Sequence, residues 1–306
     1  RFWEICDKYS VNQFYTAPTA IRSLMALGNK WVESASLKTL KVIGSVGEPI
    51  NKEAWDWYEK LVGRSNCPIV DTWWQTETGG IMISGLGDIN EQRATFAGLP
   101  LPGIHPVILD VNGIEISDDG IEGHLCIKFP WPSMLRTIYG DNQRCKHVYF
   151  SNYDGYYFTG DGAKREDGMF RIVGRVDDVL NVSGHRFGTA EIENAINSST
   201  LVTESAVVGY PHPVKGQGIY AFISLETGNH SEKDVNISVI SAVVESIGHI
   251  AKPDIIQIAQ GLPKTRSGKI MRRILRKIAE GNTEDMGDTS TLLDPSVIDS
   301  LIQGKK

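Results

Sequence analysis

The chain has 306 residues, of which 41% are hydrophobic and 22% charged, so we expect a globular protein large enough for two domains. Its formal net charge of −6 argues against a dedicated nucleic-acid binder, because such a domain is normally strongly basic. No apolar run approaches the ~18 residues of a membrane-spanning helix, which argues against a membrane protein.

The cysteines predict a reducing compartment. Cys6, Cys67, Cys126 and Cys145 lie far apart, with no C-x-x-C pair and no histidine at zinc-finger spacing. We therefore expect them to be reduced packing residues in a cytoplasmic protein.

Residues 1–90 alternate helix and strand signals. Phe2, Ile5, Cys6 and Tyr9 fall at helical spacing from the first residue onward, which suggests a fragment of a longer chain. We then expect a strand, a helix, a strand, a helix capped by Asn51, and a strand, at residues 12–16, 17–28, 40–46, 51–62 and 68–74. This order predicts a parallel α/β layer, in which ligands bind at the carboxyl ends of the strands.

The pattern of helix and strand signals changes twice after residue 90. Residues 91–176 show short β runs separated by Asn-Gly and Asp-Gly turns, which predicts an antiparallel β module. From 177 to 306 we expect a small α+β domain, with helices at 189–197, capped by Thr189, and at 231–247, and a short helix begun by Asp294-Pro295. Strands are expected there at 205–210, 219–225 and 254–259.

The junction between these domains, residues 158–188, is dense in charge and glycine. It contains Asp161, Arg175, Asp177, Asp178 and Arg186 between short apolar runs. Held on permissive backbone, these side chains could face a small anionic or polyhydroxylated ligand. Taken alone, the stretch favours the alternative of a surface hairpin with solvated charges.

The segment DTWWQTETGG at residues 71–80 favours a ligand site over a core strand. Its hydroxyl, amide and carboxyl groups directly follow a buried strand and would be poor core material. Trp73 and Trp74 could still be core residues, and in an extended strand at most one of them would line a pocket.

The stretch PKTRSGKIMRRILRK at residues 263–277 predicts an amphipathic helix with a basic stripe, which is solvated surface by default. The exception is Lys269, which follows Ser267-Gly268. We expect it at the helix start, where the helix N-terminus favours an anion that an ammonium group can reach.

Motifs that would indicate another kind of nucleotide-binding site, or a hydrolase or zinc protease, are incomplete or missing in this sequence. Ile270 stands where a phosphate-binding loop needs Ser or Thr, and the glycines at 216 and 218 lead into a strand instead of a helix. Neither G-x-S-x-G nor H-E-x-x-H occurs.

Five segments in order resemble the acyl-adenylate-forming superfamily and, in detail, its AMP-forming acetyl-CoA synthetases. They are GEP at 47–49, DTWWQTETG at 71–79, YFTGDGA at 157–163, GRVDDVLNVSGHR at 174–186 and PKTRSGKIMRR at 263–273. The resemblance implies part of a large AMP-binding domain, residues 1–176, followed by a small mobile domain, residues 177–306. It also implies that the upstream phosphate loop, and roughly the first half of the enzyme, is not in this sequence, so the isolated piece is expected to be inactive.

The resemblance implies a reaction of ATP, acetate and coenzyme A, with Mg²⁺ as cofactor. Asp161 would accept hydrogen bonds from the ribose, and Arg175 would contact ribose or phosphate. Trp74 and Val46 would close the acyl pocket, and Glu77 would help to hold Mg²⁺. The remaining nucleotide contacts would come from Gly47, Glu48, Pro49, Asp71, Thr72, Trp73, Trp74, Gln75 and Thr76.

The small domain is expected to serve both half-reactions about a hinge at Asp177. Lys269 would bridge acetate and the α-phosphate, and Arg186 would contact the nucleotide phosphate. Ser183 and Gly184 would face coenzyme A. Acetylation of Lys269 would remove its charge, so a protein acetyltransferase and a deacetylase are expected partners.

Two alternatives stay open. The protein could be a sister ligase for another short acid such as propionate, or these residues could work as a non-catalytic nucleotide-binding module.

Overall fold

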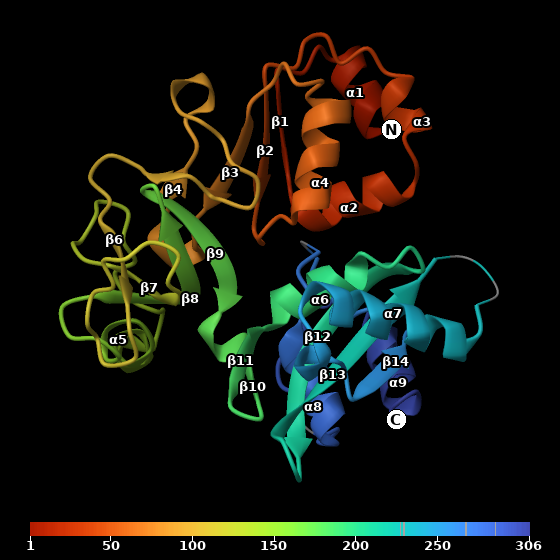
Figure 1. Cartoon of the computed structure of the whole chain (residues 1–306). Helices are drawn as coiled ribbons and strands as arrows, with labels where there is room; N and C mark the ends of the chain where they lie inside the picture. The colour runs from red at the N-terminus through yellow and green to blue at the C-terminus, as the bar shows by residue number, and fades with distance from the viewer. Residues whose placement is uncertain (227, 229, 267, 285) are drawn as a thin grey trace. The chain divides into compact units, whose positions relative to one another are not determined.

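The computed structural model describes residues 1–226, 228, 230–266, 268–284 and 286–306 (Figure 1). The chain divides into two compact units, residues 1–176 and residues 177–306, each with its own sheets and core. Among the described residues, no helix has both the length and the apolar character needed to cross a membrane.

The first part of unit 1 is the expected parallel α/β layer. Strands β1 (Gln13–Thr16), β2 (Val42–Val46) and β3 (Ile69–Trp73) pair in parallel in that order. The helices around them are α1 (Phe2–Lys8), α2 (Pro18–Ala26), α3 (Lys30–Glu33) and α4 (Lys52–Trp57), the last continuing as a π-helical turn, Tyr58–Val62. Figure 1 shows these helices gathered beside the strands, and their apolar side chains share one core with Ile43 and Ile69.

The second part of unit 1 is the expected antiparallel module. Strands β4 (Ile83–Ser84) and β5 (Leu99–Pro100) extend the first sheet beyond β3. A separate antiparallel sheet contains β6 (Pro106–Leu109), β7 (Gly123–Ile127), β8 (Tyr157–Glu166) and β9 (Met169–Arg175). Helix α5 (Asn142–Phe150), between β7 and β8, is not foreseen by the sequence reading.

In the described part of unit 2, two α-helices pack on each face of one sheet. Its strands are β10 (Val179–Val182), β11 (His185–Gly188), β12 (Val202–His212), β13 (Gly216–Leu225) and β14 (Ile255–Ile258), in the order β11-β10-β13-β12, with β14 parallel to β13. Its helices are α6 (Thr189–Asn197), α7 (Glu232–Ser246), α8 (Arg272–Glu280) and α9 (Ser296–Gln303).

Alternation along β13 explains why the residues at its centre, 219–223, are all apolar. Ile219, Ala221 and Ile223 pack with α6 and α7, whereas Tyr220 and Phe222 pack with α8 and α9. A strand covered on both faces needs apolar side chains at every position.

The sheets and helices of the two units together confirm the mixed α/β and α+β fold class predicted from the sequence.

Three local expectations are wrong. Asn51 occupies the N-cap position of α4, but its side chain donates to Glu53 instead of capping the helix. Thr189 is the first residue of α6, and Gly188 is its N-cap. Helix α8 begins at Arg272, so Lys269 lies in the preceding loop and not at a helix start.

Gly44 provides a test of the parallel layer. A Cβ atom at this position would lie 2.8 Å from Tyr15 Cδ2 and 2.8 Å from the Val70 carbonyl oxygen, which belong to the strands on either side. We expect Gly44→Ala to lower the free energy of unfolding by about 1–3 kcal/mol, because the crowded strands must shift.

Urea unfolding followed by tryptophan fluorescence measures this loss in unit 1, because all seven tryptophans lie within residues 3–131. Gly80→Ala is the control, since its Cβ would meet only Ser133 Oγ at 3.6 Å. An equal loss in both variants would contradict the packing argument.

Candidate functional site

A buried carboxylate on β8 gathers side chains from three segments of unit 1. Asp161 is only 7% exposed. Its Oδ2 accepts hydrogen bonds from Trp73 Nε1 at 3.0 Å and from Gln75 Nε2 at 2.8 Å, and Arg175 Nη1 lies 3.5 Å from its Oδ1. The interpretation of this stretch as a solvated surface hairpin is therefore wrong for Asp161.

The register of β8 and β9 brings Arg175 to Asp161. The two residues are direct partners across the strands, and Arg175 Nη1 also donates to the Thr159 carbonyl oxygen at 3.0 Å. A Cβ atom on Gly160 would lie 2.6 Å from Arg175 Nη2, so the guanidinium needs glycine there to reach its place.

Two tyrosines complete this network. Gln75 Oε1 accepts a hydrogen bond from Tyr157 Oη at 2.9 Å, and the rings of Tyr157 and Tyr149 stack with centroids 5.5 Å apart. Tyr149 Oη donates to Glu77 Oε1 at 2.6 Å, and burial together with this bond raises the pKa of Tyr149 to about 12. Neither tyrosine is foreseen as a site residue, although Tyr157 opens the motif YFTGDGA.

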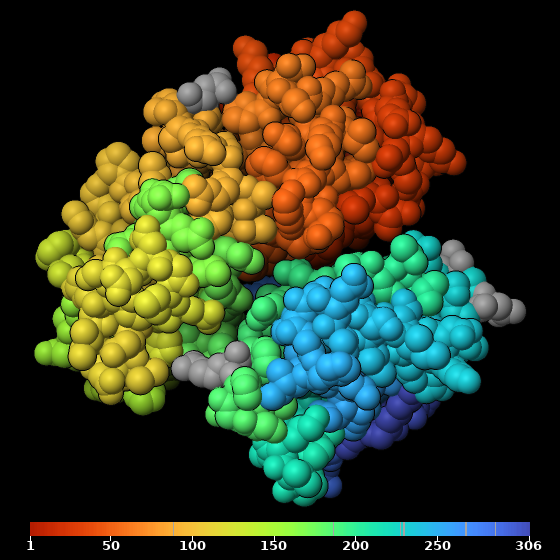
Figure 2. All heavy atoms as spheres, in the orientation of Figure 1, coloured from red at the N-terminus to blue at the C-terminus, as the bar shows by residue number. Residues whose placement is uncertain are grey.

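The two consecutive tryptophans lie in different environments, and β3 ends at the first of them. Trp73 is buried against Asp161, whereas Trp74 is 42% exposed. After them a 3-10 turn, Thr76–Thr78, is held by reciprocal bonds between Gln75 and Thr78. Figure 2 shows the orange surface of the residues near 80 against the light green of the residues near 160.

Asp71 lies on β3 beside the neighbouring strand. Its Oδ1 accepts hydrogen bonds from Ser45 Oγ at 2.6 Å and from the Thr72 backbone N–H at 3.0 Å. Burial raises the pKa of Asp71 to about 7, even though both hydrogen bonds act in the opposite direction. The carboxyl can therefore exchange a proton near neutral pH.

The segment Gly47-Glu48-Pro49 leaves the sheet at the same edge as Trp73 and Gln75, because Val46 on β2 is the register partner of Thr72 on β3. Glu48 itself is bonded to α2, through the Thr19 backbone N–H at 2.7 Å and Arg22 Nη2 at 3.0 Å. Burial alone would raise the pKa of Glu48, but these partners outweigh it and lower the pKa.

In unit 2, Ser183 and Gly184 form the two-residue turn between β10 and β11, with φ of 52° and 85°. Arg186 is the register partner of Asn181 in this hairpin, and its side chain lies outside what the structure describes. Arg276 on α8 donates to the Asp177 carbonyl oxygen at 3.3 Å and to Asp178 Oδ1 at 2.8 Å.

Lys269 is exposed in the loop before α8. Its carbonyl oxygen accepts from the Thr265 N–H at 2.9 Å, and its own N–H donates to Thr265 Oγ1 at 3.2 Å. Ser267, which was expected beside it, lies outside the described residues. The basic stripe is not simply solvated, because Arg272 pairs with Glu193 and Arg276 with Asp178.

Within the described residues, no group of three or more His, Cys, Asp or Glu side chains is arranged to hold one metal ion. Mg²⁺ commonly uses one or two carboxylates and completes its shell with water and substrate phosphates. Glu77 as a single carboxylate fits that pattern.

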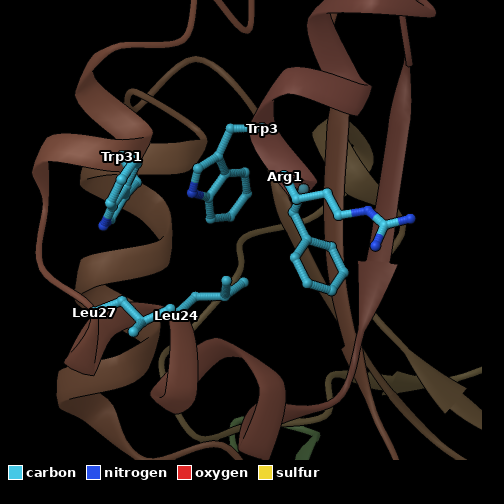
Figure 3. Close-up of a pocket in the computed structure, with 6 residues that line it drawn as sticks. Arg1, Trp3, Leu24, Leu27 and Trp31 are labelled. Atoms are coloured by element: carbon cyan, nitrogen blue, oxygen red, sulfur yellow. The ribbon is translucent and has the colours of Figure 1, made fainter.

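A separate hollow lies among α1, α2 and α3. It has a volume of about 190 Å³ and is lined by Arg1, Phe2, Trp3, Leu24, Leu27 and Trp31 (Figure 3). Its walls are mainly apolar and include none of the candidate residues, so it offers little to a phosphate or ribose.

Two family models match most of the chain. Residues 1–139 match AMP-binding enzyme, and residues 191–269 match AMP-binding enzyme C-terminal domain. A crystal structure of the anthranilate CoA ligase AuaEII in complex with anthranoyl-AMP has a similar fold, with a TM-score of 0.79 and 24% identity over 91% of this chain and 52% of that chain.

Curated relatives match over the whole chain. The acetyl-coenzyme A synthetases of Methylorubrum extorquens (strain PA1) and Saccharophagus degradans are each 57% identical over 100% of this chain and 47% of their own length. The chain thus spans about half the length of these relatives. It is a homologue of the acetyl-coenzyme A synthetases, and two stretches of it match models of AMP-binding enzymes.

Proposed function

We propose that the protein activates acetate with ATP and transfers the acetyl group to coenzyme A. The Asp161 network is the observation that carries this proposal. A buried carboxylate, oriented by Trp73, Gln75 and Arg175, suits a ribose diol, because an ionised carboxyl accepts hydrogen bonds from two neighbouring hydroxyls. The identity to acetyl-coenzyme A synthetases supports acetate as the acid.

The proposed reaction has two displacements. An acetate oxygen bonds to the α-phosphorus of ATP while the bond from that phosphorus to pyrophosphate breaks, which leaves acetyl-AMP. The sulfur of coenzyme A then bonds to the acetyl carbon, its proton is released, and AMP departs with the electron pair. Both steps bring anions together, so positioning and positive charge matter more than acid–base catalysis.

In unit 1, Asp161 would bind the ribose, and Arg175 the ribose or a phosphate. Trp74 and Val46 would limit the acyl pocket to acetate. Glu77 would hold a magnesium ion together with phosphate oxygens of ATP, and the ion would neutralise phosphate charge. The remaining contacts to adenine and the α-phosphate would come from Gly47, Glu48, Pro49, Asp71, Thr72, Trp73, Gln75 and Thr76.

In unit 2, Lys269 would bridge acetate and the α-phosphate during adenylation, and Arg186 would contact the nucleotide phosphate. Ser183 and Gly184 would face coenzyme A in the second half-reaction, with Asp177 as the hinge between the two. An acetyltransferase and a deacetylase acting on Lys269 would switch adenylation off and on.

The four cysteines, all within the described part of the chain, are thiols, which suits a reducing compartment such as the cytoplasm. Residues 1–306 alone would not complete the reaction, because their sequence holds no phosphate loop of the kind expected in the family.

Lys269→Ala separates the half-reactions. In the protein expressed at the full length of its reading frame, we expect acetate-dependent exchange of pyrophosphate into ATP to fall by at least ~100-fold, because the charge that bridges the two anions is lost. Formation of acetyl-CoA from supplied acetyl-AMP should stay within about two-fold of wild type, since this step does not use Lys269.

Lys252→Ala, an exposed lysine elsewhere in unit 2, is the matched control and should leave both rates unchanged. Equal loss of both half-reactions in Lys269→Ala would contradict the role proposed for Lys269.

Asp71→Asn tests the buried carboxyl by its pH dependence. The pKa of Asp71 is about 7 in the folded protein, and an unfolded aspartate titrates near ~4. Between these values only the folded state keeps the proton, so the contribution of Asp71 to stability is lost as pH rises toward 7. Asparagine cannot ionise, so Asp71→Asn should gain stability relative to wild type between about pH 5 and about pH 8.

Urea unfolding followed by tryptophan fluorescence at the two pH values measures the difference. Asp154→Asn, at an exposed position, is the control for the removal of one negative charge. A difference between Asp71→Asn and wild type that does not change with pH would show that Asp71 has an ordinary pKa.

A further inference from the structure

Glu193 is a buried carboxylate that the proposed reaction does not use. It lies on α6 and is 6% exposed. Its Oε1 accepts hydrogen bonds from the Val207 backbone N–H at 2.8 Å and from Arg272 Nε at 3.0 Å, and its Oε2 accepts from Arg272 Nη2 at 2.6 Å. Glu193 thus joins α6, β12 and α8 through one side chain.

The bond to Arg272 is a two-pronged ion pair. A guanidinium that binds both oxygens of a carboxylate is fixed in orientation as well as in position, which a lysine in its place would not be. Arg272 is the first residue of α8, so this pair determines where that helix begins relative to the sheet.

Lys269 lies three residues before Arg272, in a loop closed by its own backbone. The Met271 N–H donates to the Pro263 carbonyl oxygen at 2.7 Å, and the Gly268 N–H to the Thr265 carbonyl oxygen at 2.8 Å. Such a closed loop moves as a piece, so its anchors decide where the exposed Lys269 side chain points.

Two ion pairs anchor this loop to the sheet and α6. Arg272 holds its end at Glu193, and Lys264 holds its beginning at Glu204, 2.8 Å away. The loop is also bonded to the chain before α9, through the Leu293 N–H and the Lys264 carbonyl oxygen at 2.8 Å. Among these anchors the Glu193 pair has the most deeply buried carboxylate and is bidentate.

We propose that Glu193 is a positioning residue for adenylation, which acts through Arg272 to hold the Lys269 loop in place. This inference rests on the function proposed for Lys269. An error of about 1 Å in the placement of a reacting group can cost ~100-fold in rate. The Ser183-Gly184 turn, proposed to face coenzyme A, is not part of this anchor.

Glu193→Gln is the informative change. The glutamine oxygen can still accept from the Val207 N–H and from Arg272 Nε, but its NH₂ group meets Arg272 Nη2 donor to donor, so the second prong and the charge attraction are lost. In the protein expressed at full length, we expect kcat of acetate-dependent ATP–pyrophosphate exchange to fall ~10- to 100-fold, with KM for ATP and acetyl transfer from acetyl-AMP within about two-fold of wild type.

Arg272→Lys keeps the positive charge but cannot bind both oxygens of Glu193 with a planar guanidinium. Its rate of ATP–pyrophosphate exchange should lie between those of Glu193→Gln and wild type. Glu191→Gln, on the exposed side of the same helix, is the matched control and should change neither half-reaction. Hydrogen exchange adds a readout without catalysis: in Glu193→Gln the amides of residues 264–266 and 268–271 should exchange faster, while those of β13 stay protected.

A purely structural role predicts something else. Both half-reactions would then fall together with the melting temperature, and protection would be lost in β13 as well as in the loop, which would overturn the proposal. If Glu193→Gln does not fold, Glu193→Gln/Arg272→Met removes both charges and should restore folding. Adenylation should stay impaired in this double variant, and recovery to within about two-fold of wild type would overturn the proposal.

Lys269→Ala measured alongside keeps the two claims apart. If Lys269→Ala retains adenylation, the proposed function of Lys269 fails. If it loses adenylation while Glu193→Gln retains it, only the positioning role of Glu193 fails.

Discussion

The buried carboxylate of Asp161 is the interaction on which the candidate nucleotide site depends. A charge so removed from water is tolerable only with strong partners, and Trp73, Gln75 and Arg175 supply them from β3, the turn after it and β9. Gln75 in turn accepts a hydrogen bond from Tyr157, whose ring stacks on Tyr149, the donor to Glu77. One ion thereby ties the parallel layer to the antiparallel sheet.

In unit 2, Glu193 is likewise a buried carboxylate that is stabilised by an arginine and a backbone N–H. Removing one partner of a buried ion pair costs about 3–5 kcal/mol, because the other charge is left without compensation. Such pairs are weak evidence for stability as such, but they specify geometry. In unit 2 the geometry specified is the start of α8 and the loop that carries Lys269.

Regular apolar periodicity made most of the fold predictable from the sequence. The partners of the buried charged side chains were not predictable in this way. The apolar run at the centre of β13 and the turn residues around β8 and β9 are local signals, so these strands could be predicted from the sequence. The burial of Asp161 could not, because its donors Trp73 and Gln75 are 88 and 86 residues away in sequence. The sequence likewise does not distinguish Glu193 from its exposed neighbour Glu191, because only the packing of β12 and α8 against α6 buries Glu193. Helix α5 was not predicted because its sequence has too little apolar periodicity.

The proposed binding of an adenine nucleotide's ribose by Asp161 can be measured by calorimetry, with AMP compared with 2′,3′-dideoxy-AMP. Hydrogen bonds to a charged acceptor contribute about 1.5–3 kcal/mol, so the wild-type protein should bind the dideoxy compound roughly 10- to 100-fold more weakly. Asp161→Asn should bind AMP more weakly and discriminate much less between the two. Equal discrimination in the wild type and in Asp161→Asn would contradict the account.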